Sequence, residues 1–177
     1  AKSGTTWMLF CSHQIRVKGD DETYPYVDVN LSTPWPEMNQ RPGDTWDQRR
    51  LLMNTTVLPD GKSLKDYWDN PAFDFRIFKS HYNPKTFGDL IGGDSKVKFL
   101  AMARNGLDQV ASAVPFFDNH TDSFRKMWGG FPPKDGGATN EKAQEIASLR
   151  LKQMMPGGMF ESWYFEYVNN WWKAKDE

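Results

Sequence analysis

The feature that most constrains this chain is the turn at its amino-terminal end. Residues 2–6 read Lys-Ser-Gly-Thr-Thr and stand directly before a pattern that predicts a helix over residues 5–18. A glycine-containing turn at a helix start lets several backbone N–H groups point at one anion, and the helix dipole adds positive potential. Lys2 would supply a mobile charge and the hydroxyls further donors. The pattern favours either a P-loop-like anion site or an ordinary capped helix start.

Two apolar segments predict strands. Residues 96–103 are apolar at positions that would be buried on both faces, as in a parallel sheet, and residues 74–79 form a shorter candidate. A helix over residues 107–117 follows the second strand. This alternation predicts a three-layer α/β/α fold with a central parallel sheet and a P-loop-like nucleotide-binding architecture. Further helices or helical turns are expected at residues 45–53, 63–69, 84–94, 121–128, 143–154 and 160–173.

Length and composition restrict the class of protein. The 177 residues fit one domain over residues 1–177, and 22 Lys and Arg against 23 Asp and Glu give a net charge of -1. That balance lacks the basic footprint of a dedicated nucleic-acid binder. The single cysteine, Cys11, forms no internal disulfide and no zinc cluster, which favours a reducing, cytoplasmic setting. The apolar runs are too short to span a membrane.

The chain begins abruptly. Turns like the one at residues 2–6 normally follow a buried strand, and no strand precedes Ala1. We therefore expect a piece of a longer protein, incomplete at both ends.

Three ordered segments together resemble the PAPS-dependent sulfotransferases of the cytosolic type. Residues 2–7, Lys-Ser-Gly-Thr-Thr-Trp, are similar to the 5′-phosphosulfate loop of that family. Residues 79–81, Lys-Ser-His, follow a predicted strand as the family's Lys-Thr-His does. Residues 104–112 resemble its Arg-Asn-x-x-Asp-x-x-x-Ser stretch. Weaker similarities are a Pro-Trp-x-Glu element within residues 33–37 and a Trp-rich segment over residues 162–172.

The resemblance implies a role for each matching residue. His81 would be the catalytic base, and Lys2 and Lys79 would stabilise charge. Arg104 and Ser112 would bind the 3′-phosphate of PAPS (3′-phosphoadenosine 5′-phosphosulfate). The 5′-phosphosulfate and the adenine would be held by residues at the amino-terminal end: Lys2, Ser3, Gly4, Thr5, Thr6 and, for the adenine, Trp7. The product PAP would be released, and no metal is implied. The partner would be a small-molecule acceptor with a hydroxyl or amine.

Elementary chemistry agrees with these roles without requiring them. A planar, permanently charged guanidinium such as Arg104 suits a phosphate dianion. The ordinary pKa of histidine, near 6.5, would let His81 accept a proton at neutral pH. Taken singly, Arg104 could be a solvated residue, Ser112 a small packing residue and His81 a structural one. Asp108 is interpreted as a first-turn acid that complements the helix dipole.

Two other functions compete with the transferase. A P-loop kinase or nucleotide hydrolase would share the Lys-containing turn, but the predicted strand at residues 97–103 ends in Arg104 rather than in a magnesium-binding Asp. A catalytically idle nucleotide-binding module is the second alternative. The presence of Lys2, Lys79 and His81 argues against it. The acceptor itself cannot be named from the sequence, although residues 20–70 are expected to shape its pocket.

Overall fold

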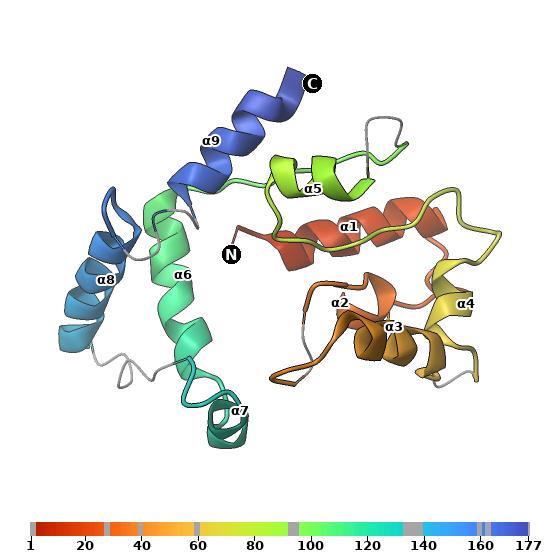
Figure 1. The fold of residues 1–177 in the computed structure, drawn as a ribbon, viewed down its shortest axis with the longest axis horizontal. Coiled ribbons are helices and arrows are strands. Elements are labelled where there is room, and N and C mark those ends of the chain that lie inside the picture. Colours follow the sequence, from red (N-terminus) through yellow and green to blue (C-terminus); the bar gives the residue numbers. More distant parts are fainter. Residues whose placement is uncertain are drawn as a thin grey trace. The chain divides into compact units, whose positions relative to one another are not determined.

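The computed structural model describes residues 3–26, 29–38, 41–58, 61–91, 96–132, 140–158, 161 and 164–176. The chain forms two compact units, and helices dominate the described part of each (Figure 1). The first unit comprises Thr5–Ser80. The second comprises His81–Glu177 together with Ala1–Gly4. The expectation of a single domain over residues 1–177 stays a prediction.

The first unit packs short helices around a small apolar core. Its described helices are α1 (Thr5–Val17), α2 (Val29–Ser32), α3 (Trp46–Thr55) and α4 (Leu64–Trp68). Helix α2 contacts both α1 and α4, and α3 contacts α4. Burial of apolar side chains stabilises this arrangement. The core consists of Leu58, Leu64, Tyr67 and Trp68, against which Leu31, Met53 and Phe73 pack.

Local capping explains where two of these helices begin. The Thr45 side chain accepts from the Gln48 N–H, and the Gln48 side chain accepts from the Thr45 N–H, which is a capping box. Ser63 caps α4 by accepting from the Asp66 N–H at 3.0 Å. These bonds satisfy backbone donors that a helix start otherwise leaves unpaired.

A buried histidine–arginine pair joins α1 to the loops beside it. His13 Nε2 donates to the Tyr24 carbonyl at 2.9 Å, and His13 Nδ1 accepts from Arg16 Nη2 at 2.7 Å. Arg16 also donates to the Ser32 carbonyl and lies over the Phe73 ring, 4.4 Å from its centroid. Burial lowers the pKa of His13, and the Arg16 charge lowers it further. The neutral imidazole is therefore the form that fits this site.

The second unit pairs its two longest described helices. Its helices are α5 (Pro84–Ile91), α6 (Gly106–Asp118), α7 (Asp122–Met127), α8 (Asn140–Met154) and α9 (Phe165–Lys173), followed by the 3-10 turn η2 (Ala174–Asp176). Helix α6 packs along α8 (Figure 1). Rings from three segments also meet, with Phe99 4.8 Å from Phe87 and 5.4 Å from Trp171 between centroids.

Arg125 joins the carboxyl end of α6 to the segment after α7. It is buried, and its guanidinium donates only to backbone carbonyls among the described residues. Its acceptors are Phe117, Asp118, His120 and Pro132. Helix ends leave carbonyls without intrahelical partners, so one cation satisfies several of them here.

The helices expected from the sequence are confirmed. The helix predicted over residues 5–18 is α1, and that over residues 107–117 is α6. The other predicted helical segments correspond to α3, α4, α5, α7, α8 and α9, with ends that differ by a few residues where the structure describes them; residues 92–94, 160 and 162–163 of these predictions lie outside the described residues. The backbone hydrogen bonds of a helix lie within its own segment, and α3, α4, α6 and α7 also have side-chain caps, which is why local sequence indicates helices.

The predicted α/β/α fold with a central parallel sheet is wrong for the part of the chain that the structure describes. Neither residues 74–79 nor residues 96–103 form a strand, and the described residues hold an isolated bridge between Val57 and Ser63. The Lys79 N–H donates to the Pro34 carbonyl in a loop rather than to a neighbouring strand. A strand needs such a neighbour, and an apolar pattern alone does not supply one.

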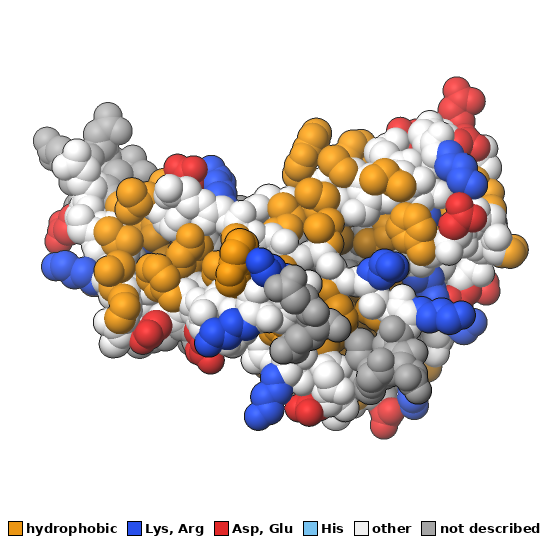
Figure 2. Space-filling view, turned by 90° about the horizontal axis from the view of Figure 1, so that it is seen from above, with side chains coloured by type: hydrophobic (Ala, Val, Ile, Leu, Met, Phe, Trp, Pro, Cys, Tyr) orange, Lys and Arg blue, Asp and Glu red, His pale blue; other side chains and the backbone are white. Residues whose placement is uncertain are grey.

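The segment at residues 96–103 is also not buried on both faces, as the sheet prediction required. Val97, Phe99 and Leu100 are 52%, 44% and 67% exposed. Figure 2 shows that hydrophobic side chains reach the surface in several places. The apolar pattern of this segment therefore does not imply that it is buried.

Candidate functional site

The amino-terminal turn adopts a conformation that favours glycine. Ser3 and Gly4 form a bend that leads directly into α1, and Gly4 has a φ of +91°. The half-buried Ser3 hydroxyl accepts a 3.4 Å hydrogen bond from Gln109 Nε2. Lys2 lies outside the described residues. The positive φ of Gly4 explains the glycine at this position, while anion binding by the turn stays a prediction.

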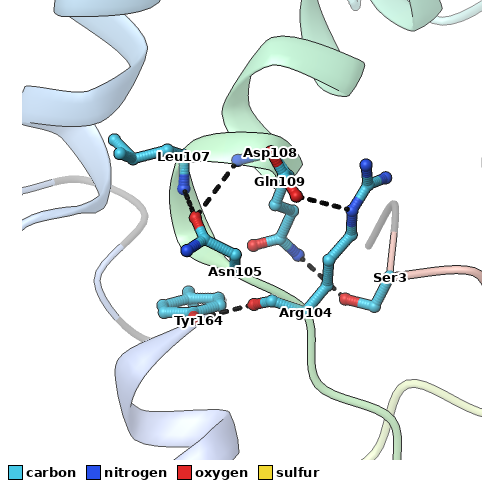
Figure 3. Close-up of polar contacts among 7 residues, drawn as sticks. All are labelled: Ser3, Arg104, Asn105, Leu107, Asp108, Gln109 and Tyr164. Atoms are coloured by element: carbon cyan, nitrogen blue, oxygen red, sulfur yellow. Dashed lines mark hydrogen bonds and ion pairs between the residues drawn. The ribbon is translucent and has the colours of Figure 1, made fainter.

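The Arg104 turn begins α6 in the same unit. Asn105 is the N-cap, and its Oδ1 accepts from the N–H of Leu107 at 2.9 Å and of Asp108 at 3.5 Å. Arg104 Nε lies 3.6 Å from Asp108 Oδ2, and the Arg104 side chain is 43% exposed (Figure 3). An exposed ion pair of this length is weak. It leaves the guanidinium accessible to solvent.

Contacts from two further elements hold this turn. Gln109, buried on the first turns of α6, connects the turn to Ser3 (Figure 3). Tyr164, just before α9, donates its hydroxyl proton to the Arg104 carbonyl at 2.8 Å. The structure therefore brings two of the segments singled out in the sequence, the Ser3 bend and the Arg104 turn, together within the second unit.

Ser112 lies half-buried on α6, on the side of the helix that Asp108 occupies. Arg104 and Asp108 are four residues apart and form an ion pair. Asp108 and Ser112 are also four residues apart on α6, and residues at this spacing share a helix face. The spacing is compatible with Arg104 and Ser112 acting on one anion.

Thr5, Thr6 and Trp7 are the first residues of α1, in the first unit. Thr5 is half-buried and Thr6 is exposed. The Trp7 indole is 67% exposed and lies 6.2 Å from the Phe10 ring between centroids. Its face is available to a planar partner, so the expectation that Trp7 contacts adenine stays open.

Lys79 lies against the Pro-Trp-x-Glu element in the first unit. Its N–H donates to the Pro34 carbonyl at 2.8 Å, and its ammonium lies 3.7 Å from the centre of the Trp35 ring. Burial lowers the pKa of Lys79, and the Glu37 carboxylate partly offsets that effect. This element was only a weak similarity in the sequence, and the structure brings it to a residue predicted to be catalytic.

His81 is the first residue of the second unit and precedes α5 by three positions. Its imidazole is exposed, so a reactant in solvent can reach it. Its role as a base remains a prediction. His81 belongs to the same unit as the Arg104 turn, whereas Lys79 belongs to the other unit.

Sequence reasoning missed two residues of this site, Gln109 and Tyr164. Gln109 stands within the Arg-Asn-x-x-Asp-x-x-x-Ser stretch, at a position where that motif prescribes no residue type. Its burial, which marks it as a polar group in need of a partner, shows only in the structure. Tyr164 stands in the Trp-rich segment, 60 positions from Arg104, and no local pattern connects the two.

The comparison with protein families identifies the chain. A family model described as "Sulfotransferase domain" matches residues 1–177, the whole chain. The chain belongs to the sulfotransferase domain family and is a transferase of sulfuryl groups. No curated protein and no solved structure matches it.

The described residues contain no group of three or more His, Cys, Asp and Glu side chains placed to hold a metal ion. None of the helices in the described ranges combines the length and hydrophobicity of a bilayer span.

Proposed function

We propose that this chain transfers a sulfuryl group from PAPS to a hydroxyl or amine of a small-molecule acceptor. The observation that carries the proposal is the meeting of the Ser3 bend and the Arg104 turn in one unit, through Gln109. Hydroxyls, helix-start N–H groups and a guanidinium are the donors that phosphate and sulfate oxygens prefer. The residues present therefore fit a donor with two separate anionic groups.

The amino-terminal residues bind the 5′-phosphosulfate in this proposal. Gly4, with its positive φ, shapes the turn, and the N-terminus of α1 contributes its dipole. The contacting groups are the Lys2 ammonium, the backbone N–H groups and the hydroxyls of Ser3, Thr5 and Thr6. Trp7 supplies an exposed indole face for the adenine ring.

Arg104 and Ser112 bind the 3′-phosphate. Among the described residues the guanidinium contacts Asp108 through Nε, at 3.6 Å, and the side chain is nearly half exposed. A phosphate dianion is a stronger partner for a guanidinium than an exposed carboxylate is. The 3′-phosphate distinguishes this donor from a simple 5′-nucleotide, so Arg104 determines donor specificity.

PAPS supplies an activated sulfuryl group, which the acceptor oxygen or nitrogen attacks in line with the bridging oxygen. His81 accepts the acceptor's proton as the new bond to sulfur forms. Lys2 and Lys79 stabilise the negative charge that develops on the departing 5′-phosphate of PAP. As in phosphoryl transfer, the residues contribute mostly positioning and electrostatics. The contact of Lys79 with Trp35 supports an acceptor site beside the Pro34–Glu37 element.

The experiment compares nucleotide binding and turnover in the full chain. Titration calorimetry with PAP and with AMP measures the two affinities in the wild type and in Arg104→Ala. We expect Arg104→Ala to weaken PAP binding about tenfold or more and AMP binding by less than about twofold, since a charge-assisted phosphate contact is lost. Equal losses for both nucleotides would reject the 3′-phosphate site.

Turnover tests the chemical step. With PAPS and a panel of phenols, alcohols and amines, we expect His81→Ala to abolish sulfuryl transfer while PAP binding is retained. Full activity in His81→Ala would reject His81 as the base. A wild-type chain that binds PAP and turns over no acceptor of the panel would favour the idle nucleotide-binding module.

A further inference from the structure

Tyr164 contacts the Arg104 turn at two points. Its hydroxyl donates to the Arg104 carbonyl at 2.8 Å, the usual length of a hydroxyl–carbonyl hydrogen bond (Figure 3). Its ring lies against Gly106, where an added Cβ would stand 3.3 Å from two ring carbons. That distance leaves little room for a side chain at position 106. The ring and the turn therefore fit closely.

The turn is held from two sides by these contacts. On the α6 side, the Asn105 cap accepts from the N–H of Leu107 and Asp108. On the α9 side, Tyr164 holds the carbonyl of Arg104 itself. Arg104 is a long side chain, 43% exposed, with many rotamers open to it. Fixing its backbone therefore limits where the guanidinium can reach.

Two chain segments 60 residues apart meet at this one carbonyl. The bond does not cap α9, since Tyr164 makes no side-chain cap contact there. It also does not extend the aromatic cluster of Phe87, Phe99 and Trp171. The hydroxyl acts on the backbone of the residue that carries the guanidinium.

We propose that Tyr164 is a positioning residue for recognition of the donor's 3′-phosphate. Its hydroxyl holds the Arg104 carbonyl and thereby places the guanidinium where the 3′-phosphate binds. This inference rests on the proposed function, because it takes Arg104 as the ligand of that phosphate. It assigns to Tyr164, at the start of α9, a part in the selectivity for bisphosphorylated over monophosphorylated nucleotides.

The test uses Tyr164→Phe, which keeps the ring on Gly106 and removes only the hydroxyl. PAP and AMP affinities are measured by titration calorimetry on the full chain. Loss of one neutral hydrogen bond predicts about a fivefold weaker Kd for PAP. The Kd for AMP, which lacks the 3′-phosphate, should change by less than about twofold.

Tyr167→Phe is the matched control. Tyr167 lies in α9, three residues after Tyr164, and the substitution removes the same hydroxyl. Its ring packs against Trp171 rather than against the Arg104 turn. We expect it to leave the ratio of the PAP and AMP affinities unchanged. If the substitutions only destabilised α9, each variant would bind both PAP and AMP more weakly.

A double-mutant cycle shows whether Tyr164 acts through Arg104. In an Arg104→Ala background, Tyr164→Phe should no longer change PAP binding. Persistence of the fivefold effect there, or equal weakening of PAP and AMP by Tyr164→Phe, would overturn the inference. If Arg104→Ala is selective for PAP but Tyr164→Phe is not, only the inference fails. If Arg104→Ala weakens the binding of both nucleotides alike, the proposed 3′-phosphate site and the inference about Tyr164 are both wrong.

Discussion

Replacing Gly4 by alanine tests whether the amino-terminal turn binds the donor in the conformation that the structure shows. Gly4 has a φ of +91°, which residues with a Cβ rarely adopt. A Cβ built there would lie 3.5 Å from Met102 Cε, an ordinary van der Waals contact. The cost is therefore conformational rather than steric, about 1–2 kcal/mol.

That cost should appear as weaker binding. With alanine at position 4 the turn can relax in the free protein, but it must return to the strained conformation to hold the phosphosulfate. One to two kcal/mol corresponds to roughly a 5- to 30-fold increase in Kd for PAP. Titration calorimetry on the full chain measures it. An unchanged Kd would refute the reasoning, because the turn would then bind nothing in this conformation.

Gly19 provides the matched control. Its φ is +78°, an added Cβ meets nothing within 4 Å, and it follows α1 at the other end. Gly19→Ala therefore carries a similar strain away from the turn. We expect it to reduce the free energy of unfolding and to leave the Kd for PAP unchanged. Equal loss of affinity in both variants would show that backbone strain on either side of α1 suffices.

Two further predictions concern stability. Because burial lowers the pKa of folded His13 below 6.5, the unfolded chain takes up the proton first as the pH falls. The free energy of unfolding should then drop below about pH 6.5, by up to about 1.4 kcal/mol per pH unit, until the folded-state pKa is reached. Urea unfolding at several pH values should show a smaller drop for His13→Asn, and identical profiles would contradict this. Arg125→Leu should cost about 3–5 kcal/mol in the same assay, since four backbone carbonyls lose their donor, whereas the exposed Lys126→Leu should change stability by less than about 0.5 kcal/mol. A small effect of Arg125→Leu would mean that water replaces the guanidinium.

Local sequence predicted the helices well. The pattern of residues 5–18 and of residues 107–117 contains the hydrogen-bonding partners and the apolar face that a helix needs within a few positions. It predicted the two strands wrongly, because a strand depends on a neighbour that can come from anywhere in the chain. Residues 96–103 have the composition of a buried strand and are exposed.

For the candidate site too, the sequence indicated some features and not others. Ordered motifs in the sequence indicated the sulfotransferase family, and the family comparison confirms it over the whole chain. The motifs named Lys2, His81 and Arg104 without indicating what surrounds them.

By itself the sequence determined the family, the helix positions and the residue types available for chemistry, since each depends on neighbours along the chain. Only the tertiary structure decided that Gln109 reaches Ser3, that Tyr164 holds the Arg104 carbonyl, and that Lys79 lies over Trp35. Those contacts join positions 44 to 106 residues apart, and no pattern within a short window encodes them.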